Sequence, residues 1–508
     1  MLPGLAILLF FVYIPVIMNI GYSFFSLSSY SAEQHFVGLD NYRRLFQSNV
    51  FPIMLKNNIL YAVISLIVQV GFGTLIALFL ESKLIRPKFG NFCRNLYYLP
   101  ALISLTAVGL MFTFIYEPSV GFLNAVLRIF HSNGFAWLGD SKLAIYCIIA
   151  MSQWQFTGYI TLLMVVAFQN VPQEFMESAA IDGAGLFKRT LYILIPQAKE
   201  QLLVCTIITI IGAFKLYTEV YATTAGGPGN STQVLGLFLY QQAFMMSWEW
   251  PRLQVYLSLW SRLFFPFCKS RSQGRERTRK MMKRTLKSLA VYIFLMILVI
   301  VILSPLAWII LNSLKTNREM FADSLALPVS WQFQNYVKAW NLGLYRYFGN
   351  SLIVSSISLV GILTCSSLLA YGLTRFQAKG SHVIFLLVLG GMTLSEQLAL
   401  VPLFKILKAI KFYDSYLAVI FPYIAFRIPF TVFLMRSYFL SIPKELEEAA
   451  IVDGYNSFQI FTKIILPISK PVIASAGIVN LNFVWNEFLF ANVFLNNSNR
   501  LDDLQGRP

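Results

Sequence analysis

Long apolar runs alternate with short polar segments along most of the chain. Ten runs come close to or exceed the roughly 20 apolar residues that a helix needs to cross a bilayer, and they form two sets of five. Because the runs are continuous rather than alternating, they predict membrane-spanning helices and exclude a closed barrel. The predicted spans lie near residues 3–25, 59–81, 97–116, 143–168 and 199–223, and then near 288–312, 350–374, 383–403, 415–437 and 468–492.

Two polar stretches of equal length interrupt this pattern at corresponding places. "ESAAIDGAGLFKRTLYILIP" begins at Glu177, and "EAAIVDGYNSFQIFTKIILP" begins at Glu448. Seven of the twenty positions are identical, namely Glu177/Glu448, Ala179/Ala450, Asp182/Asp453, Gly183/Gly454, Phe187/Phe458, Ile193/Ile464 and Pro196/Pro467. The repetition indicates two related halves.

Shorter matches support a repeat in the same order. "GLDNYRRLF" and "FQNYVKAW" each precede the second span of a half, and "NNIL" corresponds to "NSLI". Lys and Arg in short loops, such as residues 82–96, place the N-terminus and both polar stretches inside. The loop with Lys405, Lys408 and Lys411 disagrees with this orientation. The predicted fold is an all-α polytopic membrane protein with two parallel-repeat halves of about five to six transmembrane helices each.

Composition and charge agree with this class. The chain is 57% hydrophobic and 12% charged, against about 25% charged in soluble domains, and its mean hydropathy is +0.64. The net charge of +17 fits basic loops on the inner face of a membrane better than nucleic-acid binding, since no soluble basic domain is present. The five Cys and three His form no metal motif, so neither a metal site nor a cofactor is expected.

Each polar stretch predicts a short helix, a turn and a second short helix at the inner membrane surface. Pro172 suits a first helical turn, and Asp182-Gly183 is a turn signal because glycine accepts positive φ. Small alanines beside anionic residues form a compact knob that a groove in another protein could hold. An ordinary interfacial loop is the alternative, but two copies with equal spacing favour a docking site.

The pattern EAAxxDGA…P resembles the "EAA" loop of binding-protein-dependent ABC transporter permeases. The most similar group is the carbohydrate-uptake family with two different permease subunits, the maltose-type F and G pair. "FVGLDNYRRLF", "GFLNAVL" and "TAGGPGNST" resemble the F-type subunit, and "NYVKAW", "IPKELEEAAIVDG" and "FVWNEFLFA" resemble the G-type subunit. The predicted division is an F-type half at 1–250, a degenerate sixth span and basic cytoplasmic linker at 251–287, and a G-type half at 288–508.

The resemblance implies a multi-pass permease of the bacterial inner (plasma) membrane, lodged in the lipid bilayer. Two ABC ATPase subunits would grip the two loops, and an extracytoplasmic binding protein would deliver a sugar or oligosaccharide. The chain has no GxxxxGK[ST] pattern, so ATP hydrolysis is expected on the separate subunits. The implied docking residues are Glu177, Ala179, Ala180, Asp182 and Gly183 in the first loop and Glu448, Ala449, Ala450, Asp453 and Gly454 in the second.

Polar residues inside the spans are candidates for the substrate pathway, because such residues are costly in lipid. Candidates in the first half are Gln153, Trp154, Gln155, Lys215, Tyr217 and Glu219, and those in the second half are Asn482, Trp485 and Asn486, with Asn480 and Glu487 nearby. The resemblance favours the first half for the sugar. Hydrogen bonding between neighbouring helices is the alternative role for these residues.

Three other interpretations stay open. A secondary transporter with repeated halves would leave the two polar loops unexplained, and a membrane enzyme would need a catalytic motif that is not recognised here. The region near 250–282 and the tail after about Asn497 depart from the family pattern, and Met281-Met282 looks like the start of a second subunit. The third interpretation is therefore a non-functional, frame-shifted fusion of two permease genes, with the last span of the second half missing.

Overall fold

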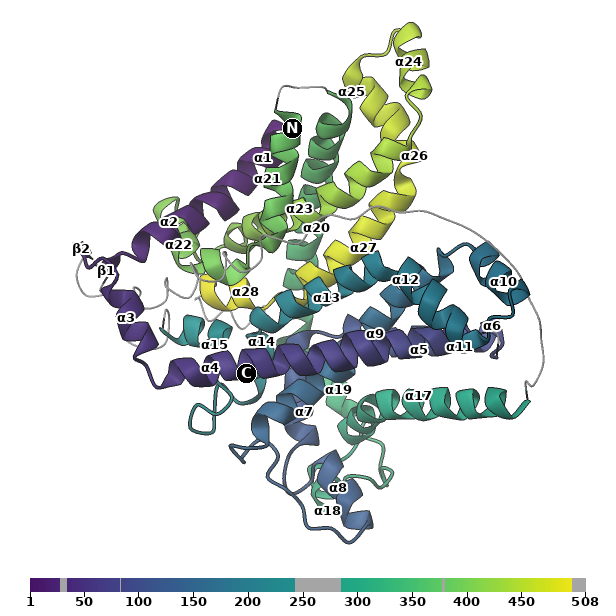
Figure 1. Cartoon of the computed structure of the whole chain (residues 1–508). Helices are drawn as coiled ribbons and strands as arrows, with labels where there is room; N and C mark the ends of the chain where they lie inside the picture. Colours follow the sequence, from purple (N-terminus) through teal and green to yellow (C-terminus); the bar gives the residue numbers. More distant parts are fainter. Residues whose placement is uncertain (28–33, 83, 243–284, 377–379, 496–508) are drawn as a thin grey trace. The chain divides into compact units, whose positions relative to one another are not determined.

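The computed structural model describes the chain except residues 28–33, 83, 243–284, 377–379 and 496–508 (Figure 1). Within the described residues, six helices are long and apolar enough to cross a membrane, and four further pairs of helices pass the same test as bent spans. Together they give up to ten spans, in line with the sequence prediction. The predicted degenerate span and basic linker at 251–287 lie almost wholly outside the described residues, as does the tail.

The described chain divides into two compact units. Unit 1 comprises the described residues of Met1–Gln47, Leu239–Phe265 and Val337–Pro508, and unit 2 comprises those of Ser48–Phe238 and Pro266–Tyr336. The two units group residues by their position in space. The boundaries predicted at residues 250 and 287 divide the chain by its sequence repeat, and the units do not test them, so these boundaries stay a prediction.

Unit 2 is built on two straight spans, two bent spans and a helix from the second half of the sequence. Its elements are α4 (Val50–Ser65), which continues through a π-helical turn (Leu66–Phe72) into α5 (Gly73–Leu80), α6 (Pro87–Tyr98), a 3₁₀ turn (Leu99–Leu102), α7 (Leu105–Ile115), α8 (Phe122–Ile129), α9 (Ala144–Gln169), α10 (Gln173–Ile181), α11 (Leu186–Arg189), a π-helical turn (Thr190–Leu194), α12 (Ile195–Gln197), α13 (Lys199–Phe214), α14 (Thr218–Thr223), α15 (Leu235–Tyr240), α17 (Thr285–Ser313) and α18 (Asn317–Ala322). α15 runs across the boundary between the units.

Unit 1 combines the first span of the chain with the helices of the second half. Its elements are α1 (Leu2–Leu8), a π-helical turn (Leu9–Tyr13), α2 (Ile14–Tyr22), the antiparallel strands β1 (Phe25–Leu27) and β2 (Gln34–Phe36), α3 (Asp40–Phe46), α20 (Tyr345–Arg375), α21 (Ser381–Thr393), α22 (Glu396–Ala409), α23 (Tyr416–Ser441), α24 (Glu445–Val452), α25 (Ser457–Ile460), a π-helical turn (Phe461–Ile465), α26 (Leu466–Ile468), α27 (Lys470–Asn486) and α28 (Leu489–Phe494). α19 (Gln334–Ala339) and a π-helical turn (Trp340–Leu344) lead into α20.

The first span of each sequence half packs into the unit that holds the other half's helices. In unit 1, α1 contacts α20 and α23, and α2 contacts α22. In unit 2, α17 contacts α6 and contributes Leu295 to a buried core with Tyr97 and Met164. The Tyr97 hydroxyl donates to the Leu295 carbonyl over 2.7 Å. Each unit therefore depends on chain segments from both halves of the sequence.

Bends distinguish the other four spans from the straight helices. α6 and its 3₁₀ turn meet α7 at 95°, and α21 meets α22 at 99°. The spans after the polar loops bend by 65° before α13 and by 76° before α27. Ala198 and Ser469 sit at these latter breaks with nearly equal backbone angles, φ −87° and −85°. The sequence predicted continuous spans at 97–116, 199–223, 383–403 and 468–492, and all four predictions were wrong. The first and third are broken at the 95° and 99° bends, while α13 ends at Phe214 inside the second and α27 ends at Asn486 inside the fourth.

A glycine of α9 lies directly against the backbone of α6 in unit 2. A Cβ atom added at Gly158 would lie 1.7 Å from the Tyr97 carbonyl oxygen and 2.5 Å from its carbon. Both clashing atoms are backbone, so a rotamer change cannot relieve them. α9 approaches α6 this closely only because residue 158 has no side chain.

We expect Gly158→Ala to destabilise unit 2 by about 1–3 kcal/mol or more, as overpacking of a tight core does. Gly212→Ala is the matched control, because Gly212 is also helical but has open space around its added Cβ. The measurement is the midpoint of thermal unfolding of the detergent-solubilised chain. Equal midpoints for the two variants would contradict the close packing of α9 on α6.

Candidate functional site

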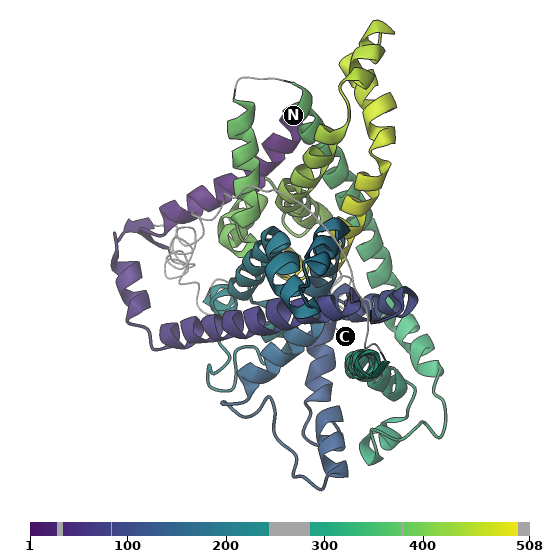
Figure 2. The same ribbon diagram turned by 45° about the vertical axis from the view of Figure 1, so that its right-hand side comes forward.

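The two polar loops, residues 172–197 and 443–468, fold in the same way within their own units. Each is a short helix, α10 or α24, followed by a turn and a second helix. At the end of α10, the Ala184 amide donates to the Ala179 carbonyl over 2.8 Å, and at the end of α24 the Tyr455 amide donates to the Ala450 carbonyl over 2.9 Å. These six-residue closures are Schellman helix ends. Figures 1 and 2 show the α24–α25 region projecting beyond the adjacent ends of the other helices of unit 1.

Each helix end depends on a glycine in the left-handed region. Gly183 has φ +78° and Gly454 has φ +83°. A Cβ atom added at either position would meet nothing within 4 Å. These glycines are therefore needed for their backbone conformation and not for space. The predicted Asp-Gly turns are present in both copies.

The predicted docking residues are distributed between surface and interior. Asp182 and Gly183 are exposed in the first loop, while Glu177 and Ala179 are half-buried. In the second loop Glu448, Ala449, Asp453 and Gly454 are exposed, and Ala450 is buried. Ala180 belongs to α10, and its side chain lies outside the described part of the structure. The two motifs thus present a carboxylate and a glycine at their tips.

Sequence reasoning missed an apolar residue at each tip. Ile181 is 69% exposed and Val452, at the equivalent position, is 87% exposed. Large apolar side chains at matching positions of two loops indicate a recurring contact surface. The available signal was their position, directly before the Asp-Gly turn in both copies.

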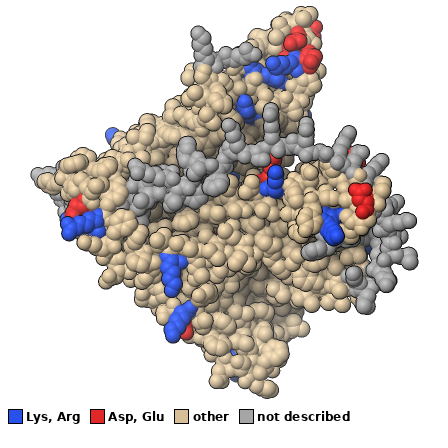
Figure 3. Space-filling view, viewed as in Figure 1, with Lys and Arg blue, Asp and Glu red and all other residues tan. Residues whose placement is uncertain are grey.

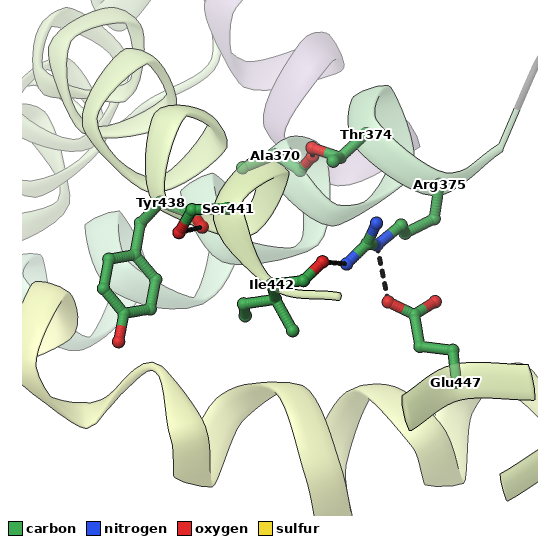
Figure 4. Close-up of polar contacts among 7 residues, drawn as sticks. All are labelled: Ala370, Thr374, Arg375, Tyr438, Ser441, Ile442 and Glu447. Atoms are coloured by element: carbon green, nitrogen blue, oxygen red, sulfur yellow. Dashed lines mark hydrogen bonds and ion pairs between the residues drawn. The ribbon is translucent and has the colours of Figure 1, made fainter. Parts of the chain in front are cut away.

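An ion pair ties the second loop to a membrane span. Arg375, the last residue of α20, donates from Nη2 to the Ile442 carbonyl over 3.0 Å. Its Nε lies 2.5 Å from Oε1 of Glu447 on α24, and these side chains are only 8% and 13% exposed. Figure 4 shows the guanidinium between the carbonyl and the carboxylate. Burial raises the pKa of Glu447, and the charge of Arg375 opposes that rise.

The first loop has a different connection. Met176 occupies the position that corresponds to Glu447, and its carbonyl accepts from Nη1 of Arg189 over 3.1 Å. This bond links α10 to α11 within the loop. The tips of the two loops therefore have the same structure, but different side-chain contacts hold the two loops in place.

Both loops carry charged side chains. In the view of Figure 3 most of the described surface carries no charged side chains; acidic and basic residues lie over α24 and α25 and over the region of α10 and α11, and also near α3 and at a few separate places. Uncharged flanks are typical of membrane-facing helices. The loops have the polar character of surfaces that meet water or a soluble protein.

Three candidate pathway residues of unit 2 contact neighbouring helices. Gln153 donates to the Ser65 hydroxyl over 3.1 Å, and Gln155 donates to the Ile103 carbonyl over 2.9 Å. The indole of Trp154 donates to the Ile302 carbonyl over 3.1 Å. The Ile103 carbonyl lies at the 95° bend, so Gln155 satisfies a backbone group at that break.

The other candidates of unit 2 lie around the end of α13. Tyr217 and Glu219 are buried, and Lys215 is half-buried. The ring of Tyr217 stacks on Tyr221 with centroids 5.4 Å apart. The asparagine pair of "NNIL" acts nearby, since Asn58 donates to the Ala213 carbonyl over 2.7 Å.

The candidates of unit 1 lie on α27. Trp485 is 40% exposed, and its ring meets Phe348 at 5.6 Å in an edge-to-face arrangement. Asn482 and Asn486 are half-buried and hydrogen-bonded to each other over 2.9 Å. These side chains leave more accessible surface than Gln153 and Gln155 do.

Three polar residues of α23 that contact the candidates Asn480 and Glu487 were missed. Nε of Arg427 donates to Oδ1 of Asn480 over 3.1 Å, and the same asparagine donates to the Thr431 hydroxyl over 2.9 Å. The Tyr423 hydroxyl donates to Glu487 over 2.8 Å. An arginine inside an apolar run was the signal that could have revealed these residues. Among the described residues, no group of His, Cys, Asp or Glu could hold a metal ion.

Comparisons with known proteins cover both halves of the chain. Residues 69–311 and 283–504 each match the family described as "Binding-protein-dependent transport system inner membrane component". The chain is 45% identical over 246 residues to the "Probable ABC transporter permease protein YurN" of Bacillus subtilis, which covers 48% of this chain and 84% of that protein. It is also 45% identical over 210 residues to YurM of the same organism, named in the same words, covering 41% of this chain and 70% of that protein.

A third relative has a named sugar. The "Diacetylchitobiose uptake system permease protein NgcG" of Streptomyces coelicolor is 35% identical over 193 residues, which is 37% of this chain and 63% of that protein. Each of these relatives matches less than half of the chain, as expected where one chain holds two repeats.

We expect Arg375→Met to destabilise unit 1 more than Glu447→Gln. The first change leaves a nearly buried carboxylate unpaired, which costs roughly 3–5 kcal/mol for a buried pair, whereas glutamine carries no charge.

Because burial raises the pKa of Glu447, its protonated form is favoured in the folded state. The loss caused by Arg375→Met is therefore fully present at neutral pH and shrinks as the pH falls toward the ordinary glutamate pKa of about 4.3. The measurement is the unfolding midpoint of both variants from about pH 7 to pH 5; a loss that does not shrink on acidification would contradict the assignment.

Proposed function

Because the chain belongs to the family of binding-protein-dependent transport system inner membrane components, we propose that its two polar loops are the sites where separate ABC ATPase subunits dock to drive the import of a sugar or oligosaccharide. The chain is a multi-pass inner-membrane permease subunit and not an enzyme. Transport in this family depends on a binding protein. The number of ATPase subunits, one for each loop, is part of the proposal.

The repeated geometry of the loop tips is the observation that carries the docking proposal. Two loops with different sequences end their first helix with the same bond pattern and the same positive-φ glycine. Each places an exposed apolar side chain, Ile181 or Val452, beside an exposed Asp-Gly pair. An apolar knob with a polar rim fits a groove on a soluble partner.

The ion pair between Arg375 and Glu447 would let a docked ATPase act mechanically on a membrane span. Arg375 connects α24 to the end of α20 through the Ile442 carbonyl and Glu447. A force applied to α24 is then passed to a membrane span through a nearly buried ion pair rather than through a mobile linker. This connection supports a role in conformational coupling between an ATPase and the transmembrane helices.

The sugar as substrate is supported by relatives. NgcG is named for diacetylchitobiose uptake, and the first-half motifs resemble the F-type subunit of carbohydrate permeases. A secondary transporter and a frame-shifted fusion are the competing readings, and the second of these concerns residues that lie mostly outside the described structure.

The docking test substitutes the exposed apolar tips. We expect Ile181→Asp together with Val452→Asp to weaken ATPase binding by roughly tenfold or more, because a partner surface would bury an unpaired charge. Both positions are exposed, so the fold should be retained. The measurement is co-purification of the ATPase subunits with the permease.

Leu327→Asp is the matched control, since Leu327 is 69% exposed but lies outside both loops. The double variant Gly183→Pro with Gly454→Pro, which disrupts both turns, should also lose the ATPase. Full ATPase binding by both double variants would contradict docking at these loops and would favour a secondary transporter.

For the substrate pathway we propose that α27 contributes more directly than the Gln153–Gln155 segment. We expect Trp485→Ala to reduce sugar uptake with little change in unfolding midpoint, since the ring is 40% exposed and offers a stacking face. Gln155→Leu should instead lower the midpoint, because it leaves the Ile103 carbonyl unpaired at a cost of about 1–3 kcal/mol. Uptake and unfolding are measured on both variants in proteoliposomes and detergent. A stable Gln155→Leu with lost uptake would reverse the assignment.

A further inference from the structure

The same asparagine contact closes the end of the first span in both units. In unit 1, Nδ2 of Asn41 donates to the carbonyls of Ser23 and Phe25 over 2.9 and 3.2 Å. In unit 2, Nδ2 of Asn335 donates to the carbonyls of Ser313 and Lys315 over 3.0 and 3.3 Å. Ser23 directly follows α2, and Ser313 is the last residue of α17.

A tyrosine completes each contact. The serine hydroxyl at the end of each span donates to the carbonyl three residues earlier, from Ser23 to Ile20 over 2.7 Å and from Ser313 to Ile310 over 2.8 Å. A hydroxyl has one hydrogen, so the neighbouring tyrosine hydroxyl must donate to the serine oxygen. These distances are 3.0 Å for Tyr42 and 2.7 Å for Tyr336. We call Asn41-Tyr42 and Asn335-Tyr336, each with its serine, the Asn–Tyr clamps.

The clamps supply hydrogen-bond donors to carbonyl groups at the end of each span. The last carbonyls of a helix have no partner within the helix, and such groups are costly where water is scarce. The clamp supplies donors from the short segment that follows, which is α3 in unit 1 and the start of α19 at the end of unit 2. As a result, each short helix is fixed directly at the end of a membrane span.

Exposed apolar residues lie at or next to both ends of each short helix, at matching positions. The residue two before the clamp asparagine is Leu39 in one copy and Phe333 in the other, exposed by 67% and 65%. The residue five after it is Phe46 or Trp340, exposed by 54% and 50%. Positions seven apart lie on one face of a helix. The two copies therefore correspond at these two exposed apolar positions.

The spans that end at the clamps also carry exposed apolar residues. On α17, Ile300 and Ile310 are 62% and 56% exposed, and on α2, Ile17 is 65% exposed. Each clamp also places an exposed basic residue, Arg44 or Lys338, three positions after its asparagine. Apolar and aromatic side chains next to basic ones, at the end of a span, are typical of the boundary between acyl chains and headgroups.

We propose that residues 39–46 and 333–340 are two membrane-interface anchors that bind the lipid headgroup region, each held there by its Asn–Tyr clamp. The anchors fix the depth and direction of the first span of each half, α1–α2 and α17. Since those spans pack into the units formed mainly by the other half's helices, the anchors hold both units at the membrane boundary. A docking surface for a soluble binding protein is the competing occupant of the same faces.

The test measures the depth of both anchors in the full chain. Leu39→Cys and Phe333→Cys are labelled with an environment-sensitive fluorophore and placed in lipid nanodiscs whose lipids carry a quencher close to the headgroup. We expect a blue-shifted emission and strong quenching at both positions. The unsubstituted chain, with its five native cysteines, gives the labelling background.

Arg44→Cys and Lys338→Cys are the matched controls, because they lie on α3 and α19 five residues after Leu39 and Phe333, which is about 140° around a helix. We expect weaker quenching there. Quenching at Leu39→Cys and Phe333→Cys that does not exceed the controls would overturn the proposal. Loss of quenching when purified binding protein is added would overturn it as well, in favour of a protein-docking surface.

The clamp itself is tested in the labelled background. Asn41→Asp and Asn335→Asp remove the amide hydrogens while keeping the side-chain size, and they should reduce quenching at the anchor of the same copy only. Tyr42→Phe and Tyr336→Phe provide milder variants if the aspartates impair folding. Unchanged quenching in folded clamp variants would show that the clamps do not hold the anchors.

Discussion

The structure depends on satisfying backbone carbonyls wherever a membrane-embedded helix breaks or ends. Side-chain amides do this repeatedly. Gln155 meets the Ile103 carbonyl at the 95° bend, Asn58 meets the Ala213 carbonyl close to the end of α13, and Asn41 and Asn335 close the ends of the first spans. In lipid, each such carbonyl would otherwise be costly. Bent spans and short interfacial helices are possible here because these amides accompany them.

The repeat explains how two polar loops came to share one geometry. Each loop follows a straight span, α9 or α23, and precedes a span that is bent at a residue with nearly the same backbone angles. The loop tip and the bend thus belong to one structural motif that occurs in both halves. The differences lie in the brace, which is the Arg375–Glu447 pair in unit 1 and a bond within the loop, from Arg189 to Met176, in unit 2. A partner that grips both tips would therefore act on two differently braced units.

Much of this was predictable from the sequence, because membrane spans and Asp-Gly turns leave local signals. The ten spans, the twin loops and the glycines at their tips needed only hydropathy, spacing and the preference of glycine for positive φ. The roles of Gln155 and Trp154 were not predictable, since their partners Ile103 and Ile302 lie 52 and 148 residues away. A polar residue in a span looks the same in sequence whether it binds a ligand or a carbonyl. The Arg375–Glu447 pair was equally hidden, because its members lie on separate helices.

Hydrogen–deuterium exchange tests the central claim, that the two loops hold a separate motor, most directly. The permease would be compared in nanodiscs with and without its purified ATPase subunits. The account predicts slower exchange in peptides covering 173–189 and 445–460 when the ATPase binds, with no change in the segment 317–330. Protection elsewhere with both loops exchanging as before would contradict it.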